Sequence, residues 1–310
     1  MNKSILLSFF LLVAAISLHA QEIFDAVKAN NLTRVKTLVE KDGALVNLKD
    51  EAGNTLLHQA AMTGSVPVTE LLLSNGADKN AINTQLNTPL HLAIQNGKDE
   101  VAEYLIAKGT DLTIQNIVKK TPLHLTVRHN RKAIAELLIA RGVAIDPRDD
   151  MGRTPLGLAA RETGNVEIAA LLISKGADVN ARDVDNWMPL NFAAWKGFNR
   201  MIELLLDHGA EYDASGGRTL QMLQFAAGCG SVRLFRMVLE RGKDLFSNEA
   251  ANNSMMRNAI AGGSTEIVHM LMAKGIPIRN DANSFGWTPL HFAASNGHLA
   301  MIELLVKKRG

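Results

Sequence analysis

Short amphipathic segments alternate with polar, extended ones along most of the chain. Apolar residues at helical spacing, such as Met201, Ile202, Leu205 and Leu206, predict one helix of each pair. A shorter apolar segment over residues 90–94 predicts the other. Polar stretches such as residues 177–183 separate the pairs and predict extended turns. The pattern therefore predicts an all-α chain of repeated helix pairs.

The same four-residue box precedes the first helix of many pairs. Its copies begin at 33- or 34-residue steps over most of the chain: Thr55-Leu56-Leu57-His58, Thr88-Pro89-Leu90-His91, Thr121-Pro122-Leu123-His124, Thr154-Pro155-Leu156-Gly157, Met188-Pro189-Leu190-Asn191 and Thr288-Pro289-Leu290-His291. Threonine caps a helix N-terminus, and proline at the next position has no N–H to leave unpaired. The longer steps indicate insertions, one of them Thr163 in a loop between helices.

Glycine follows both helices of the predicted pair. The first set is Gly64, Gly97, Gly164, Gly197, Gly230, Gly263 and Gly297, and the second includes Gly76, Gly109 and Gly209. Glycine is the residue that most easily adopts the left-handed conformation at a helix end. Four of the first set are followed by Ser65, Asn165, Ser231 or Ser264, which predict N-caps for the second helix.

This pattern resembles the ankyrin repeat, a 33-residue unit with the box T-P-L-H-x-A. The resemblance covers residues 21–310 and implies an all-α ankyrin-repeat solenoid of nine helix-turn-helix repeats with short extended turns. The expected repeats are 21–49, 50–82, 83–115, 116–148, 149–182, 183–215, 216–248, 249–282 and 283–310.

The repeats at the ends and near residue 250 depart from the pattern. Asp25 and Lys28 place charges in the first repeat, which suits a capping repeat with one face in water. The final helix reaches residues 307–310 without a trailing turn, which leaves open a longer natural protein or an abrupt cap. Residues 221–224 and 254–257 replace the box in repeats seven and eight. Glycines cluster there too, so we expect this segment to be the least stable part of the stack.

The N-terminal residues have the composition of a secretory signal peptide. Lys3 is followed by an apolar run over residues 5–18 and by Ala20. The run is too short to span a bilayer, which needs about 20 apolar residues. We therefore predict a signal peptide over residues 1–20, cleaved after Ala20; the alternative is a buried N-terminal helix. The expected destination is the bacterial periplasm, with full secretion as the second choice.

Charge and cysteine content narrow the possible partners. Without residues 1–20, 32 basic side chains face 31 acidic ones, so nothing in the composition favours nucleic acid or an anionic membrane. Cys229 is the only cysteine, which excludes an internal disulfide. We expect a small passive side chain there, since no base lies beside it in sequence.

The candidate chemical groups favour structural roles. His58, His91, His124 and His291 recur once per repeat, about 10 Å apart, too far to share a metal ion. In the ankyrin family this histidine holds the turn by hydrogen bonds. The acidic pairs Asp149-Asp150 and Asp183/Asp185 lie in predicted turns, where we expect solvated carboxylates. No phosphate-binding loop, nucleophile elbow or cofactor motif is present, so no catalytic residue, metal or cofactor is predicted.

Large aromatic and charged side chains at turn tips and first helices are the candidate partner-binding residues. The resemblance implies that these positions line a concave surface that binds proteins, and aromatic and arginine side chains concentrate binding energy. The candidates are Trp187, Trp195, Lys196, Arg161, Glu162, Arg128, His129 and Trp287, with Phe285 beside the last. Local packing of each tryptophan on its own turn is the alternative.

The function expected from the sequence is a non-catalytic, monomeric protein-binding module in an exported compartment. The alternative is a recognition arm of an enzyme whose catalytic domain lies beyond residue 310 or on a separate subunit. Neither the partner nor the process is specified by the residues.

Overall fold

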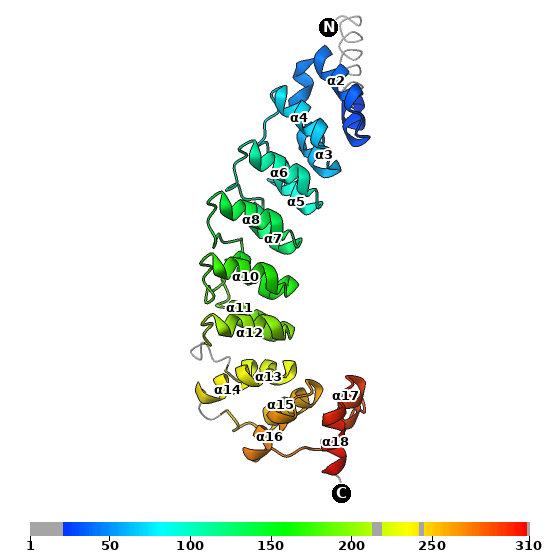
Figure 1. Ribbon diagram of the computed structural model, residues 1–310. Helices are drawn as coiled ribbons and strands as arrows, with labels where there is room; N and C mark the ends of the chain where they lie inside the picture. Colours follow the sequence, from blue (N-terminus) through cyan, green and yellow to red (C-terminus); the bar gives the residue numbers. More distant parts are fainter. Residues whose placement is uncertain (1–20, 213–218, 242–244, 309–310) are drawn as a thin grey trace, which may run out of the picture. The chain divides into compact units, whose positions relative to one another are not determined.

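The computed structural model describes residues 21–212, 219–241 and 245–308, and it is all-α (Figure 1). Within these ranges no β-strand occurs, and the one extended pairing is an isolated bridge between Lys49 and Thr55. The chain forms two compact units, unit 1 up to Pro155 and unit 2 from Leu156. The predicted signal peptide, residues 1–20, lies outside the described residues. The all-α prediction is confirmed.

Unit 1 consists of helix pairs that follow a short N-terminal helical segment, residues 21–28. Its helices are α2 (Leu32–Lys41), the 3₁₀ helix η1 (Gly43–Asn47), α3 (Leu56–Thr63), α4 (Val66–Ser74), α5 (Pro89–Gln95), α6 (Asp99–Ala107), α7 (Pro122–Arg128) and α8 (Lys132–Ala140). The first helices α3, α5 and α7 pack in one row and the second helices α4, α6 and α8 in another. Leucine and isoleucine side chains between the rows are fully buried.

Unit 2 repeats the same arrangement. Its helices are α9 (Pro155–Leu158, starting at the last residue of unit 1), η2 (Ala159–Thr163), α10 (Val166–Ser174), α11 (Pro189–Lys196), α12 (Asn199–Asp207), α13 (Thr219–Cys229), α14 (Val232–Arg241), α15 (Glu249–Ala261), α16 (Thr265–Ala273), α17 (Pro289–Ser295) and α18 (Leu299–Lys307). The first helices α11, α13, α15 and α17 pack in sequence against one another. Among the described residues, no helix of either unit is both long and apolar enough to cross a bilayer.

The threonine box starts the first helices as predicted. The Thr88 hydroxyl accepts from the His91 N–H at 3.4 Å, and His91 Nδ1 accepts from the Thr88 N–H at 3.2 Å. Histidine thus takes the place that Glu or Gln has in an ordinary capping box. In α11, Asn191 does the same work, since its Oδ1 accepts from the Met188 N–H at 2.9 Å. The box therefore survives a change of the histidine.

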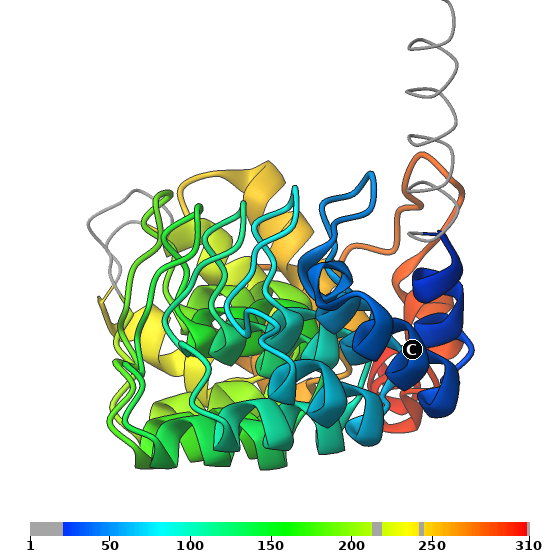
Figure 2. The same ribbon diagram turned by 90° about the horizontal axis from the view of Figure 1, so that it is seen from above.

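The first helices α3, α5, α7, α11 and α17 are each preceded by a five-residue turn held by the first side chain of that turn. In the turn 83–87, Asn83 Oδ1 accepts from the N–H groups of Gln85 and Asn87 at 2.9 and 3.0 Å. In unit 1 consecutive turns also bond through their backbones: Ile117 N–H donates to the Gln85 carbonyl at 2.9 Å, and Asp150 N–H to the Val118 carbonyl at 3.1 Å. The extended segments before α5 and α7 consequently run side by side (Figure 2).

The insertion in repeat five is absorbed inside a helix, and the predicted loop position of Thr163 is wrong. Residues Ala159–Thr163 form a π-helical turn, in which the Gly164 N–H donates to the Ala159 carbonyl at 2.8 Å, five residues back. The helix accommodates one extra residue by widening, because its ends are fixed by packing. The wider turn carries Arg161 and Glu162.

Helices α13 and α15 approach closely at their glycines. A Cβ atom on Gly262 would lie 2.6 Å from the carbonyl oxygens of Ala227 and Gly228. The same addition at Gly228 would meet only Asn258 Cβ, at 3.8 Å. Gly262 is therefore required by close backbone packing, whereas Gly228 is not.

Candidate functional site

Six of the eight predicted binding residues occupy two neighbouring positions at or just after the end of a first helix, whereas Trp187 and Trp287 stand immediately before the box. Trp195, Arg161, Arg128 and Gln95 share one repeat position, and Lys196, Glu162, His129 and Asn96 share the next. Arg128 and His129 belong to unit 1, whereas Arg161, Glu162, Trp195 and Lys196 belong to unit 2.

In unit 2, Trp187 and Trp195 belong to one aromatic cluster. Their rings meet edge to face, with centroids 5.9 Å apart. Trp187 also lies 5.1 Å from the Phe192 ring and 6.3 Å from the Phe225 ring. Trp187 is half-buried, while Trp195 remains 46% exposed. Trp187 thus packs locally, as the alternative interpretation held, and at the same time supports an exposed tryptophan.

Two cations lie on the faces of this cluster. Lys196 Nζ is 4.2 Å from the centre of the Trp195 ring, and the Arg161 guanidinium carbon is 5.8 Å from that of Phe192. Both distances are typical of cation–π contacts, which stabilise by about 0.5–1 kcal/mol at exposed sites. Glu162, next to Arg161, is exposed. The π-helical turn thereby contributes a charge to a surface that extends over three consecutive repeats.

In unit 1, Arg128 and His129 line a hollow of about 470 Å³ between two turns and the helices α5 and α7. The wall of the hollow is rich in side-chain amides and also includes apolar and basic residues: Gln85, Asn87, Gln95, Asn96, Asn116, Ile117, Val118, Lys120, Leu125, Arg128 and His129. This surface is concave and predominantly polar, unlike the aromatic cluster of unit 2.

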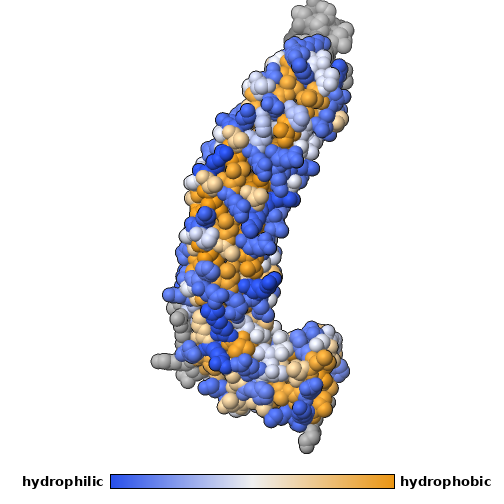
Figure 3. Space-filling model, in the orientation of Figure 1, coloured by the Kyte–Doolittle hydropathy of each residue, from blue (hydrophilic) through white to orange (hydrophobic). Residues whose placement is uncertain are grey.

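Trp287 belongs to a third group, in the last repeat. Its ring lies 5.2 Å from Phe292 and 6.3 Å from His291. Phe285, two residues before it, is 84% exposed. Hydrophobic residues also gather over α17 and α18 in the space-filling view (Figure 3), where Leu299 and Val306 are exposed. Trp287 therefore contacts only residues of the last repeat in this group, whereas Trp187 contacts Phe192, Trp195 and Phe225.

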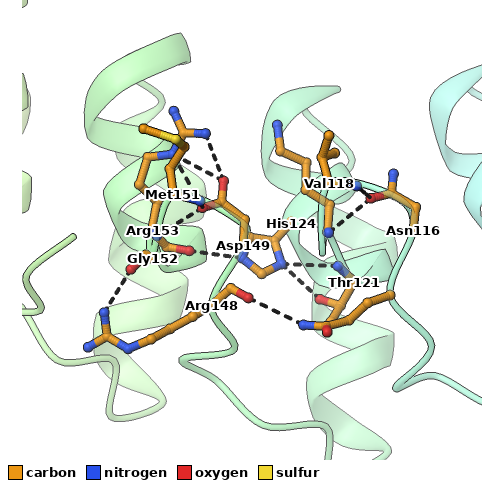
Figure 4. Close-up of polar contacts among 11 residues, drawn as sticks. Asn116, Val118, Thr121, His124, Arg148, Asp149, Met151, Gly152 and Arg153 are labelled. Atoms are coloured by element: carbon orange, nitrogen blue, oxygen red, sulfur yellow. Dashed lines mark hydrogen bonds and ion pairs between the residues drawn. The ribbon is translucent and has the colours of Figure 1, made fainter. Parts of the chain in front are cut away.

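The repeated histidines link successive repeats. Nε2 of His58, His91 and His124 lies 2.8, 3.2 and 3.1 Å from the main-chain carbonyl oxygens of Asn87, Lys120 and Arg153, each 29 residues further on. Figure 4 shows His124 between Thr121 and Arg153. The structural role expected from the family resemblance is confirmed for these three. Within the described ranges, no group of His, Cys, Asp and Glu side chains is arranged to hold a metal ion.

Burial keeps these histidines neutral. It lowers the pKa of His91 to about 4 and lowers the pKa of His58 and of His124, because a charged imidazole loses hydration in the core. Burial also raises the pKa of the Cys229 thiol. None of these groups is thereby prepared for acid–base or nucleophilic chemistry at neutral pH.

The expectation of a solvated carboxylate is wrong for Asp149. Asp149 is only 3% exposed, and its carboxylate forms an ion pair with Arg153 (Figure 4). The distance from Arg153 Nη2 to Asp149 Oδ2 is 2.9 Å. Asp149 Oδ1 also accepts from the N–H groups of Met151 and Arg153. The first position of the turn points inward to bind the backbone, so its carboxylate is structural. Asp150 and Asp185 are exposed as expected, and Asp183 binds its own turn in the same way as Asp149.

Several contributors to these surfaces were not predicted. Phe192 and Phe225 belong to the aromatic cluster, and Gln85, Gln95 and Asn116 to the hollow. Phe192 and Phe225 are 33 residues apart, so the repeat spacing already placed them in adjacent repeats. An isolated Gln or Asn in the sequence gives no comparable indication that its side chain will line a hollow.

The fold and its surfaces define a class of protein, a stack of helix pairs joined by hydrogen-bonded turns. The family model described as ankyrin repeats, in three copies, matches residues 23–116, 114–183 and 223–310, most of the sequence. The chain belongs to the ankyrin repeat family, and such repeats indicate a protein–protein interaction module.

Curated relatives share only part of their repeats with this chain. Palmitoyltransferase akr1 of Schizosaccharomyces pombe is 42% identical over 60 residues, 19% of this chain and 9% of that protein. A homologue of transient receptor potential cation channel subfamily A member 1 from Caenorhabditis elegans is 51% identical over 47 residues, 15% of this chain and 4% of its own length. The FYVE zinc finger domain protein UPA1 of Mycosarcoma maydis is 43% identical over 51 residues, which is 16% of this chain and 4% of that protein. The chain spans less than a tenth of each of these relatives.

Proposed function

We propose that this chain binds a partner protein through the aromatic cluster of unit 2, with Trp195 as the central contact. The observation that carries the proposal is a tryptophan left 46% exposed although it is held in place by a second ring and a cation. Tryptophan and arginine are enriched among residues that dominate binding energies. A side chain already held in one orientation also loses less conformational entropy on binding.

The neighbouring residues complete an interface of mixed character. Arg161 and Lys196 flank the aromatic rings, which gives the apolar centre a charged edge. Protein interfaces commonly combine an apolar centre with a polar rim.

We further propose that residues 1–20 direct export and are removed, as their composition supports, so that the partner is an exported protein. N-terminal sequencing of the protein recovered from its own cells tests the cleavage after Ala20.

The binding site is tested by capture of partners from the exported-protein fraction. The wild type and a Trp195→Ala variant are compared by quantitative mass spectrometry, and affinity for each captured protein is then measured by calorimetry. We expect Trp195→Ala to weaken binding by about 2 kcal/mol or more, a loss typical of a central interface tryptophan. A Trp187→Ala, Trp195→Ala double variant is expected to lose at least as much.

Trp287→Ala is the matched control, because Trp287 is similarly exposed but contacts His291 and Phe292 instead. Its affinity is expected to equal that of the wild type. Circular dichroism confirms that each variant is folded. Unchanged affinity of a folded Trp195→Ala variant would refute the proposed site.

A further inference from the structure

We propose that the hollow of unit 1 binds the main chain of an extended, uncharged segment of a partner protein, with the side-chain amide of Asn87 as the central donor. This proposal rests on the proposed function in requiring that the chain bind a protein, but it does not require that Trp195 take part. It goes beyond that function because it names the chemistry of the bound segment and a second place of contact.

Asn87 has a hydrogen-bond donor that the fold leaves unpaired. Its main-chain N–H donates to Asn83 Oδ1 at 3.0 Å, and its main-chain carbonyl oxygen lies 2.8 Å from His58 Nε2. Its side-chain Oδ1 accepts from Asn116 Nδ2 at 3.1 Å. Of the polar groups of Asn87, only Nδ2 makes no hydrogen bond within the described part of the chain.

The neighbouring Asn116 fixes the orientation of this amide. Asn116 Oδ1 accepts from the N–H groups of Val118 and Lys120 at 3.2 and 2.9 Å, so Asn116 faces Asn87 with its nitrogen. Asn87 can meet that nitrogen only with its oxygen, because an amide nitrogen is a donor alone. Asn87 is 8% exposed and lines the hollow, and its Nδ2 is not among the unpaired atoms sealed from solvent in the described ranges. The donor therefore opens onto the hollow and is already oriented for an acceptor.

Two further amides extend the polar surface around Asn87. Gln85 comes from the turn and Gln95 from the end of α5, and both line the hollow. Their side chains make no hydrogen bond to other described residues. Each of these amides carries a donor and an acceptor, as does each peptide unit of an extended segment. The three side chains together therefore suit the main chain of a partner rather than one particular side chain.

The remaining wall residues favour an uncharged ligand with an aliphatic side chain. The basic residues of the wall, Lys120, Arg128 and His129, each already interact within the chain, so they give no preference for an acid. Ile117 is 54% exposed and Val118 is 38% exposed, and both line the hollow. An aliphatic side chain of the partner can cover these two residues and remove apolar surface from water.

The experiment begins with a selection of random linear peptides displayed on phage against the full chain. We expect the enriched peptides to share a run of uncharged residues that includes Val, Ile or Leu. A synthetic peptide of that sequence should bind with nearly the same affinity at about 0.05 and 0.5 M salt, because no ion pair contributes. Replacing single peptide bonds by esters removes one N–H and weakens one acceptor. At one or more positions this should weaken binding about three- to tenfold, as the loss of a neutral hydrogen bond implies.

Two variants place the bound peptide in the hollow. Asn87→Asp keeps the oxygen that accepts from Asn116 and removes the unpaired donor. Gln95→Leu removes one amide at a position where other repeats carry Arg or Trp, so the fold tolerates the change. Each variant should bind the synthetic peptide about three- to tenfold more weakly than the wild type. An ester that weakens binding to the wild type should weaken binding to the matching variant by less, since the two changes remove the same hydrogen bond.

The controls separate this proposal from the tryptophan site. Gln221→Leu, which removes an exposed glutamine of α13 outside the hollow, and Trp195→Ala should both leave peptide affinity unchanged. Thermal midpoints show that each variant is folded. The proposal would be overturned by a consensus that requires a charged residue, by no enriched peptide, or by full affinity in folded Asn87→Asp and Gln95→Leu. So would binding of a neutral oligosaccharide that is lost in Gln95→Leu. Failure here with a positive Trp195 result would leave the proposed function standing.

Discussion

The buried histidines tie individual side chains to the stability of unit 1. Each of His58, His91 and His124 joins its own helix start to the turn that follows in the next repeat. The interaction needs the neutral imidazole, because burial opposes a charge on the ring. A structural role and a sensitivity to acid therefore belong to the same residue.

Stability should fall as the pH decreases from 6.5 towards 4. Below pH 6.5 an unfolded His91 binds a proton, whereas the folded one binds it only near its lowered pKa of about 4. Protons therefore favour the unfolded chain in this interval, by up to about 3 kcal/mol for His91 at its lower end. The effect levels off at lower pH. Urea denaturation at a series of pH values measures it.

His91→Asn is the matched variant for this prediction, because Asn191 already occupies the equivalent position with its cap bond intact. We expect the variant to be about 1 kcal/mol less stable at pH 7, from the lost link to Lys120, but to show a shallower decline with acid. An identical pH slope in the variant would show that His91 does not titrate as its burial requires.

Among the elements, α13 and α15 show that two glycines of one sequence cluster have opposite roles. Gly228 lies inside α13 with room for a methyl group, while Gly262 faces two carbonyl oxygens at 2.6 Å. Glycine content alone indicated a weak segment. The close approach shows that part of this content serves packing between two helices.

Gly228→Ala and Gly262→Ala should consequently change stability in opposite directions. The first is expected to stabilise by up to about 1 kcal/mol, because alanine is the better helix former. The second should destabilise by about 1–3 kcal/mol, since the helices must move apart. Denaturation midpoints measured side by side test the pair, and a shift of the same sign in both would contradict the packing described.

The sequence predicted the regular elements well and the irregular ones poorly. The box at Thr88 and the glycine after α3 belong to local motifs, so their structures follow from a few neighbouring residues. The sequence did not predict the position of Thr163, because an extra residue can lengthen a loop or widen a helix. The packing of the folded chain determines which of the two occurs. The burial of Asp149 likewise depends on the folded turn. The same holds for the hollow, which needs residues from two repeats.

At the scale of the whole molecule, stability should be uneven along the stack. Repeat proteins gain stability from each repeat and from each interface with a neighbour. Residues 221–224 and 254–257, which lie inside α13 and α15, replace the threonine box and lack its histidine link. We expect amide hydrogens in α13–α16 to exchange faster than those in α3–α8, measured by hydrogen–deuterium exchange with mass spectrometry. Slower exchange in α13–α16 would contradict this expectation.

The links between repeats in unit 1 are made to main-chain atoms, and this has an evolutionary consequence. The histidines approach the carbonyl oxygens of Asn87, Lys120 and Arg153, three residues with different side chains. Because every amino acid supplies that carbonyl, the side chain at this position can change without removing the acceptor of the bond that joins the repeats. The side chains at these three positions can therefore diverge during evolution while the links between repeats are kept.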